Sequence, residues 1–202
     1  MHMKRDIKEE LISILKKKGV IRPKDLVQHG IRREYLSRFH KQGLLRRDVR
    51  GVYYLNNAPI TENNAMAIAC KRVPHGVICL LTALRFHNIG TQNPTEIWMA
   101  IDEKARRPKL PYPKLKIVRF CESSLTTGIE THIIEGVPVK VFNPAKTIAD
   151  CFKYRNKIGL DVFLEAIKEC QREQRCTYDE IWKYAKTCRV SGTIKPYLEA
   201  MA

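Results

Sequence analysis

The stretch from Val20 to Leu55, VIRPKDLVQHGIRREYLSRFHKQGLLRRDVRGVYYL, constrains the fold more than any other part of the chain. It begins with a helix-like segment at 23–29, where a proline suits the first turn because its missing N–H has no helical partner there. Gly30 permits a sharp turn, and a second helix is expected from about Arg32 to Gln42. Two β-prone runs around Arg50-Gly51 then predict a hairpin. This order is typical of a winged helix-turn-helix.

The second predicted helix divides into an apolar face and a polar, basic face. At 3.6 residues per turn Leu36 and Phe39 share one face, which would hold the helix to its domain. We expect the opposite face to meet the DNA major groove and the flanking arginines to hold phosphates. The predicted groove residues are Arg33, Ser37, Arg38 and Lys41, and the predicted phosphate contacts are Arg32, Arg46, Arg47 and Arg50.

Basic residues on an amphipathic helix are also commonly nothing more than a solvated face. The helix pair alone therefore indicates little, and the basic hairpin that follows it in the right order strengthens the DNA-binding interpretation. The charge of the whole chain agrees, because a net charge of +16 over 202 residues favours polyanionic partners. Residues 1–57 hold 15 Lys and Arg against 6 Asp and Glu, so the charge is densest where the helix pair lies.

Composition and motifs exclude several other classes of protein. A hydrophobic content of 44% is ordinary for a globular protein. No run of about 18 or more apolar residues predicts a membrane span, and the start MHMKRDIKEELIS has no apolar signal core, so we expect a cytoplasmic protein. The 7 cysteines are dispersed without a C-x-x-C pair, which indicates reduced thiols in a core. The 6 histidines show no metal-ligand spacing, and we expect neither metal nor cofactor.

The remaining patterns predict an α+β fold with two domains. Residues 1–57 would form the winged helix-turn-helix, and residues 58–202 an α/β body with a small mixed sheet and a helical tail. The expected helices cover residues 4–18, 62–73, 77–89, 144–154, 160–171, 178–188 and 194–201, and the expected strands cover 96–101, 115–120, 129–134 and 137–142. Glu135-Gly136 is a good hairpin turn, Asn143-Pro144 a good helix start, and Thr177 with Glu180 a capping box.

Three places outside the N-terminal segment carry polar groups that could do chemistry. Asp102-Glu103-Lys104 ends a predicted strand beside a basic loop and faintly resembles the metal-binding core of some nucleases. However, the acid well upstream followed by acid-x-Lys that such enzymes use is not clearly present. His87 fits a satisfied polar residue at a helix end. Lys146, Thr147 and Asp150 lie on one helix face, where local hydrogen bonds and an i,i+4 ion pair are expected.

The chain resembles the AbiEi family of antitoxins from bacterial abortive-infection, type IV toxin–antitoxin systems. The resemblance rests on the basic winged segment ending RGVYYL, on GVICLLTALRFHNIG and EIWMAI, and above all on GVPVKVFNPAKTIADCFKYR, and it covers roughly residues 4–168. It implies that the N-terminal domain binds inverted repeats in the promoter of its own operon and represses it. It also implies that the C-terminal domain neutralises a toxin of the nucleotidyltransferase class.

Two other functions remain open from the sequence. One is a metal-dependent nuclease-like protein, or a DNA-modification accessory subunit, that uses the middle sheet. The other is an interaction protein whose C-terminal body binds the toxin directly, with DNA binding secondary. The chain carries no nucleotidyltransferase signature of its own, since it lacks a Gly-Ser followed by Asp-x-Asp.

Overall fold

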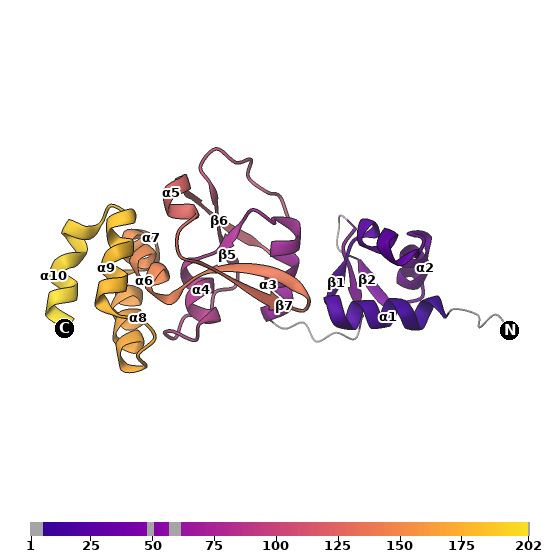
Figure 1. The fold of residues 1–202 in the computed structure, drawn as a ribbon, viewed down its shortest axis with the longest axis horizontal. Coiled ribbons are helices and arrows are strands. Elements are labelled where there is room, and N and C mark those ends of the chain that lie inside the picture. The colour runs from indigo at the N-terminus through magenta and orange to yellow at the C-terminus, as the bar shows by residue number, and fades with distance from the viewer. Residues whose placement is uncertain (1–5, 48–50, 57–61, 202) are drawn as a thin grey trace. The chain divides into compact units, whose positions relative to one another are not determined.

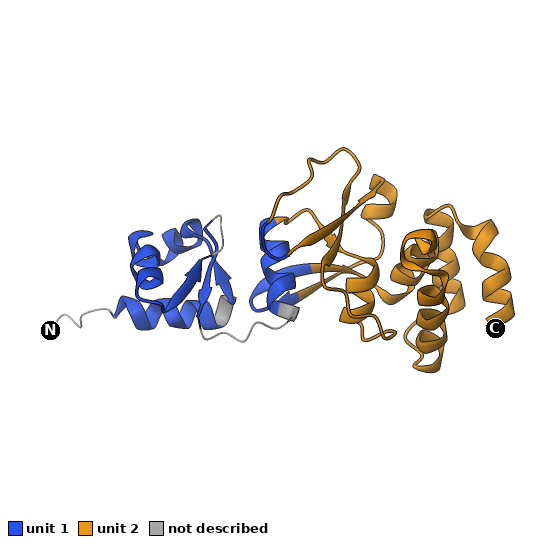
Figure 2. Cartoon of the chain, turned by 180° about the vertical axis from the view of Figure 1, so that it is seen from behind, with its two compact units in different colours: residues 1–72, 111–113, 133–139 blue, residues 73–110, 114–132, 140–202 orange. Residues whose placement is uncertain are grey.

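The computed structural model describes residues 6–47, 51–56 and 62–201, and within them it shows an α+β chain with two small sheets. The chain divides into two compact units, shown in Figure 2. Unit 1 comprises residues 1–72, 111–113 and 133–139, and unit 2 comprises residues 73–110, 114–132 and 140–202. None of the helices in the described ranges is long and apolar enough to span a membrane.

Unit 1 begins with a small helical bundle closed by a three-stranded sheet. In chain order its elements are α1 (Ile7–Lys18), β1 (Val20–Ile21), the 3-10 helix η1 (Pro23–His29), α2 (Glu34–Lys41), β2 (Leu45–Arg47), β3 (Tyr53–Leu55) and α3 (Glu62–Arg72). The sheet has the order β1-β3-β2, with antiparallel pairing throughout. Asp6 caps α1 by accepting hydrogen bonds from the amides of Lys8 and Glu9, which satisfies two donors at the helix start.

The second sheet has five strands in the order β6-β5-β4-β8-β7. Figure 1 labels β5, β6 and β7 of this sheet. Its strands are β4 (Val77–Ile78), β5 (Ile97–Asp102), β6 (Leu115–Phe120), β7 (Ile129–Ile134) and β8 (Val137–Phe142). The sheet is mixed, as predicted, because β5 runs parallel to β6 and β4 parallel to β8, whereas β4 and β5 are antiparallel. Glu135 and Gly136 have φ angles of 50° and 71°, and this left-handed pair forms the predicted hairpin turn.

The prediction of a helix over 77–89 is wrong for its first residues. Val77 and Ile78 form β4 in the middle of the sheet, and helix α4 covers only Leu80–Phe86. A short apolar run that is buried on both sides has the same sequence pattern in a helix and in a strand. Here pairing with β5 on one side and β8 on the other decides in favour of the strand.

The C-terminal half of unit 2 is helical, as expected, and its local start signals are confirmed. The helices are α5 (Glu122–Leu125), α6 (Pro144–Lys153), α7 (Arg155–Ile158), α8 (Leu160–Arg172), α9 (Tyr178–Thr187) and α10 (Ser191–Met201). Asn143 caps α6 by accepting a 2.8 Å hydrogen bond from the amide of Lys146, and Thr177 with Glu180 forms the capping box of α9. The short helices α5 and α7 were not predicted, and α10 begins before the expected Ile194.

A fully buried ion pair lies in the core of unit 2. The Lys146 ammonium donates to both carboxylate oxygens of Asp150 at 2.6 Å, and neither side chain has any exposed surface. Lys146 also donates to the Ser124 hydroxyl at 3.2 Å and lies 4.4 Å from the ring centroid of Phe142. The Cys188 thiol donates to Asp150 at 3.1 Å. The expected i,i+4 ion pair on α6 is therefore confirmed, and all of its partners are internal.

His87 and the cysteines also take the structural roles expected of them. Nε2 of His87, the C-cap residue of α4, lies 2.8 Å from the carbonyl oxygen of Phe142, so this nitrogen carries the proton and donates. Burial lowers the pKa of His87, which keeps the ring neutral. Six cysteines are buried as free thiols, and Cys121 is half-buried.

Replacing one partner of the buried ion pair should destabilise unit 2 far more than replacing both. Asp150→Ala leaves the ammonium of Lys146 buried without a counter-charge, which costs about 3–5 kcal/mol in the free energy of unfolding. The double variant Lys146→Met, Asp150→Leu removes both charges and should recover most of that loss. Urea unfolding followed by tryptophan fluorescence measures it, because both tryptophans, Trp98 and Trp182, lie in unit 2. Additive losses in the double variant would contradict the coupling.

Candidate nucleic-acid interface

Helix α2 carries an apolar face and a polar face, with the residues divided as the sequence predicts. Leu36 has no exposed surface and Phe39 is 8% exposed, and both join the core that α1, η1 and the sheet build. Ser37, Arg38 and Lys41 are exposed. The helix itself is shorter than expected, since it covers Glu34–Lys41, and Arg33 precedes it as the N-cap residue.

The turn before α2 sets the direction in which that helix starts. Gly30 follows η1 with φ 64° and ψ 19°, a left-handed conformation that glycine adopts without a steric penalty. Ile31 is buried directly after it and anchors the turn, so that Arg32 and Arg33 lie exposed on the way into the helix. The same geometry places Arg32 at the N-terminal tip, as predicted, with Arg33 beside it as the N-cap residue.

The carboxylate of Asp25 holds the start of η1 in place. The backbone N–H of Arg22 donates to the carboxylate of Asp25 at 2.8 Å. Burial alone would raise the pKa of Asp25, but this hydrogen bond and the neighbouring cations outweigh it and hold the pKa below its ordinary value. The carboxylate is therefore charged at neutral pH and fixes the start of the segment that leads into α2.

The hairpin β2–β3 presents two more of the predicted arginines. Leu45 is buried, whereas Arg46 and Arg47 are exposed and pair across the sheet with Tyr54 and Tyr53. Nε of Arg46 donates to Oδ1 of Asn56 at 2.6 Å, and the Arg47 guanidinium lies 5.7 Å from the ring centroid of Tyr53. Both side chains are thus held along the hairpin, which the sequence did not indicate. Arg50 lies outside the described residues.

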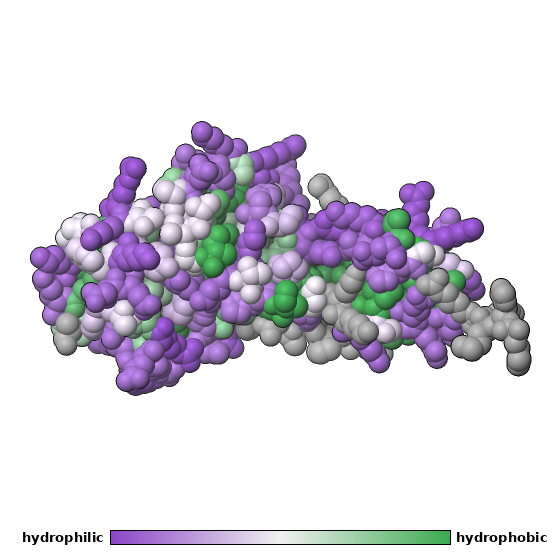
Figure 3. All heavy atoms as spheres, in the orientation of Figure 1, coloured by the Kyte–Doolittle hydropathy of each residue, from purple (hydrophilic) through white to green (hydrophobic). Residues whose placement is uncertain are grey.

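The predicted contact residues 32, 33, 38, 41, 46 and 47 are cations without an acidic partner in the described part of the chain. Within the described ranges, no carboxylate lies at ion-pair distance from the cations at positions 32, 33, 38, 41, 46 and 47. Cations in this state attract an external anion, and a phosphate backbone supplies many in a row. On the face of the molecule seen in Figure 3, hydrophilic side chains cover most of the surface.

The alternative site considered from the sequence, the nuclease-like segment Asp102-Glu103-Lys104, shows only local contacts of Asp102. Asp102 is the last residue of β5, and its Oδ1 accepts a 2.8 Å hydrogen bond from the amide of Lys104, as a residue at a strand end commonly does. Across the described residues, no group of three or more His, Cys, Asp or Glu is arranged to hold a metal ion. The Asp102 side chain therefore stabilises the turn that follows β5.

One basic cluster was missed by sequence reasoning. Arg107, Lys116, Arg119 and Lys157 line a pocket in unit 2 together with Trp98 and Tyr154. These residues come from β5, β6, the loop between them and the segment after α6, so no short motif holds them. The only sequence signal is the basic, proline-rich loop EKARRPKLPYPK before β6.

Comparison with known proteins bears on the segment that carries the predicted DNA contacts. A family model described as a transcriptional regulator, AbiEi antitoxin, matches residues 9–56. The match confirms the predicted family resemblance over these residues, which include every predicted contact. A search of curated proteins gave no match.

The fold also has a counterpart among solved structures. The crystal structure of the RV2827C protein from Mycobacterium tuberculosis is similar with a TM-score of 0.59, and the similarity covers 96% of this chain and 79% of that chain. The two sequences are 13% identical, so the similarity concerns the fold alone. It supports the α+β architecture over almost the whole length.

Truncating a side chain on the buried face of α2 should destabilise unit 1 far more than truncating one on its exposed face. Leu36→Ala opens a cavity in the core and should lower the free energy of unfolding by about 2–5 kcal/mol. Arg38→Ala, two positions further along, removes only exposed atoms and should change it by about 0.5 kcal/mol or less. Hydrogen exchange at the amides of α1 and α2 measures both changes within unit 1. Equal losses would mean that Arg38 contributes to the core.

Proposed function

We propose that this chain is a DNA-binding repressor and antitoxin in which residues 1–57 form a winged helix-turn-helix domain and residues 58–202 an antitoxin domain. The observation that carries the DNA-binding half is the exposed face of α2, where Ser37, Arg38 and Lys41 lie opposite the buried Leu36 and Phe39. The family match over residues 9–56 falls on the same segment.

In this proposal α2 enters the major groove of the promoter of its own operon. Arg38 and Lys41 offer donors to acceptor atoms on base edges, and Arg33 and Ser37 contact the groove beside them. The phosphate contacts come from Arg32 at the tip of α2 and from the hairpin arginines Arg46, Arg47 and Arg50. Inverted repeats suit a protein with one such domain per chain, because two copies then bind two half-sites related by a two-fold axis.

The antitoxin half of the proposal rests on the family resemblance. Residues 58–202 would neutralise a toxin of the nucleotidyltransferase class, and neither repression nor neutralisation requires this chain to perform a catalytic step or to hold a metal or cofactor. The fold of unit 2, with its internal ion pair Lys146–Asp150, supplies a stable body for that role.

Removing the basic residues from the exposed face of α2 should abolish recognition of the operator. In Arg38→Ala, Lys41→Ala, two donors to the groove are lost while the core face is intact, so affinity for the DNA upstream of the gene should fall to the level of scrambled DNA. Mobility-shift titrations with both DNAs at two salt concentrations measure this. A wild-type preference of about a thousandfold is typical of specific recognition at physiological salt.

A matched control separates recognition from bulk charge. Lys168→Ala, Lys183→Ala removes the same two positive charges from exposed positions in unit 2 and should retain operator preference. Undiminished operator affinity in the α2 variant would refute the recognition-helix assignment. Equal binding of wild type to both DNAs, falling steeply with salt, would show counterion release alone and refute specific repression.

The same α2 variant tests the division of labour between the two parts. Because antitoxicity is assigned to residues 58–202, Arg38→Ala, Lys41→Ala should still restore growth of cells that express the toxin, when the variant is supplied from an unrelated promoter. Colony counts under toxin induction measure the rescue, with the wild-type chain as reference. If the variant accumulates normally but loses the rescue, antitoxicity depends on the DNA-binding face and the division is wrong.

A further inference from the structure

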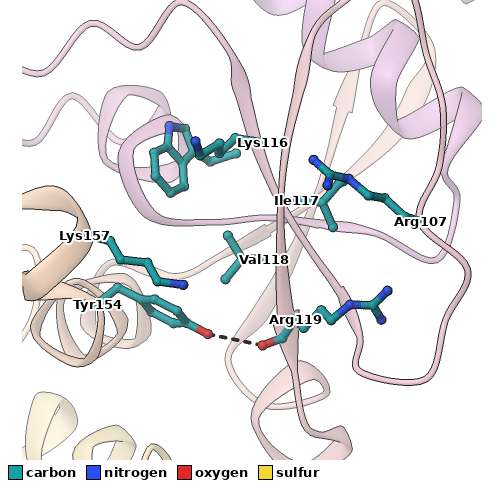
Figure 4. A pocket seen from close by; sticks show the side chains of 8 residues that line it. Arg107, Lys116, Ile117, Val118, Arg119, Tyr154 and Lys157 are labelled. Atoms are coloured by element: carbon teal, nitrogen blue, oxygen red, sulfur yellow. Dashed lines mark hydrogen bonds between the residues drawn. The ribbon is translucent and has the colours of Figure 1, made fainter.

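A pocket of about 640 Å³ lies along β6, the strand at the outer edge of the five-stranded sheet. Its volume falls in the range of small-molecule sites, roughly 300–1,000 Å³. The pocket reaches both faces of the strand (Figure 4). Lys116, Tyr154 and Lys157 lie on one side of β6, and Arg107 and Arg119 lie on the other.

The charged residues that line the pocket are all positive. Four cations gather there, at positions 107, 116, 119 and 157, and the lining includes no carboxylate. In the described part of the chain, none of the four forms an ion pair. A hollow with charges of one sign focuses the electrostatic potential, so a multivalent anion is the ligand that this pocket favours.

Arg119 is oriented for such a ligand before it binds. Nη1 of its guanidinium donates to three backbone carbonyl oxygens at the end of β5 and in the turn after it, those of Asp102, Glu103 and Ala105, at 3.0 Å in the case of Ala105. Its remaining N–H groups have no protein partner among the described residues. An arginine fixed in this way loses little conformational entropy when those groups bind an anion.

The edge of β6 adds donors and disfavours a peptide. The amides of Ile97 and Glu103 donate to the carbonyls of Lys114 and Phe120, so the backbone groups of the odd-numbered residues between them point to the outer edge. There the Tyr154 hydroxyl donates to the carbonyl of Arg119 at 3.2 Å. A strand added at this edge would have to displace that hydroxyl, whereas a small anion needs only the N–H groups.

Two aromatic rings complete the lining. The ammonium of Lys116 lies 5.8 Å from the ring centroid of Trp98, and that of Lys157 lies 5.5 Å from the ring centroid of Tyr154. Tyr154 is fixed by stacking on Phe120, and burial raises its pKa, so its hydroxyl remains a donor at neutral pH. Aromatic rings interleaved with cations suit a ligand that joins a flat ring to a polyanion.

We propose that this pocket binds a free nucleoside polyphosphate, with the base beside Trp98 and Tyr154 and the phosphates among the four cations. A nucleoside triphosphate combines an aromatic ring with a compact negative charge, and its size suits the hollow. A DNA duplex also carries phosphates, but it presents them on a broad convex surface. The experiment must therefore distinguish a bound nucleotide from bound DNA. The proposal concerns unit 2 alone and is independent of the proposed repressor function.

Isothermal titration of the full chain with ATP and with GTP tests the proposal. At least one of the two should bind with one site per chain, and tripolyphosphate or adenosine alone should bind at least about tenfold more weakly, since each offers only half of the chemistry. The variant Lys116→Gln, Lys157→Gln should weaken nucleotide binding about tenfold or more. Lys168→Gln, Lys183→Gln removes equal charge from elsewhere in unit 2 and should bind as wild type does.

Several outcomes would overturn the proposal. They are no binding of either nucleotide, equal weakening by the two lysine variants, or tripolyphosphate binding as tightly as the nucleotide. A duplex of scrambled sequence that displaces the nucleotide from the wild type, but has lower affinity for the pocket variant, would assign the pocket to DNA. Urea unfolding followed by the fluorescence of Trp98 and Trp182, which both lie in unit 2, serves as the check on folding, and the unfolding midpoint of the pocket variant should equal that of the wild type.

Discussion

The buried ion pair between Lys146 and Asp150 is the interaction on which the body of the protein depends. A charge without surface exposure is tolerable only when its partners surround it, and here they come from several elements. Ser124 belongs to α5, the rings of Phe120 and Phe142 end β6 and β8, and the Cys188 thiol follows α9. The pair thus fixes α6 against the sheet and against the helical tail. It also fixes the position from which the chain continues to Tyr154 in the pocket.

Local signals in the sequence predicted those elements whose ends are set by local hydrogen bonds or turn chemistry. Asn143 and the Thr177 capping box predict the starts of α6 and α9 because their side chains accept hydrogen bonds from backbone amides three residues further along the chain. Glu135-Gly136 announces its hairpin for a similar reason. The signals failed at Val77-Ile78, where partners far along the chain choose a strand, and at α5 and α7, which are too short to show a helical period.

The α2 interface and the pocket along β6 also differ in how far the sequence alone predicts them. The faces of α2 follow from residue spacing on one helix, so the sequence alone separates Leu36 from Arg38. The hairpin contacts of Arg46 and Arg47 depend on strand register and were not predicted. The pocket along β6 draws on residues from Trp98 to Lys157, and only the fold brings them together. Its one sequence signal, the basic loop before β6, predicted neither where the pocket lies nor what kind of ligand it binds.

The two faces of α2 share no residue, and this has a consequence for how such a protein can diverge. The leucine and the phenylalanine that hold the helix in its core, Leu36 and Phe39, make no demand on the identity of the side chains opposite them. Those exposed side chains can be exchanged at almost no expense in stability. Under the proposed function, duplicated copies of a gene with this architecture can therefore acquire separate target sequences within one genome while the scaffold stays the same.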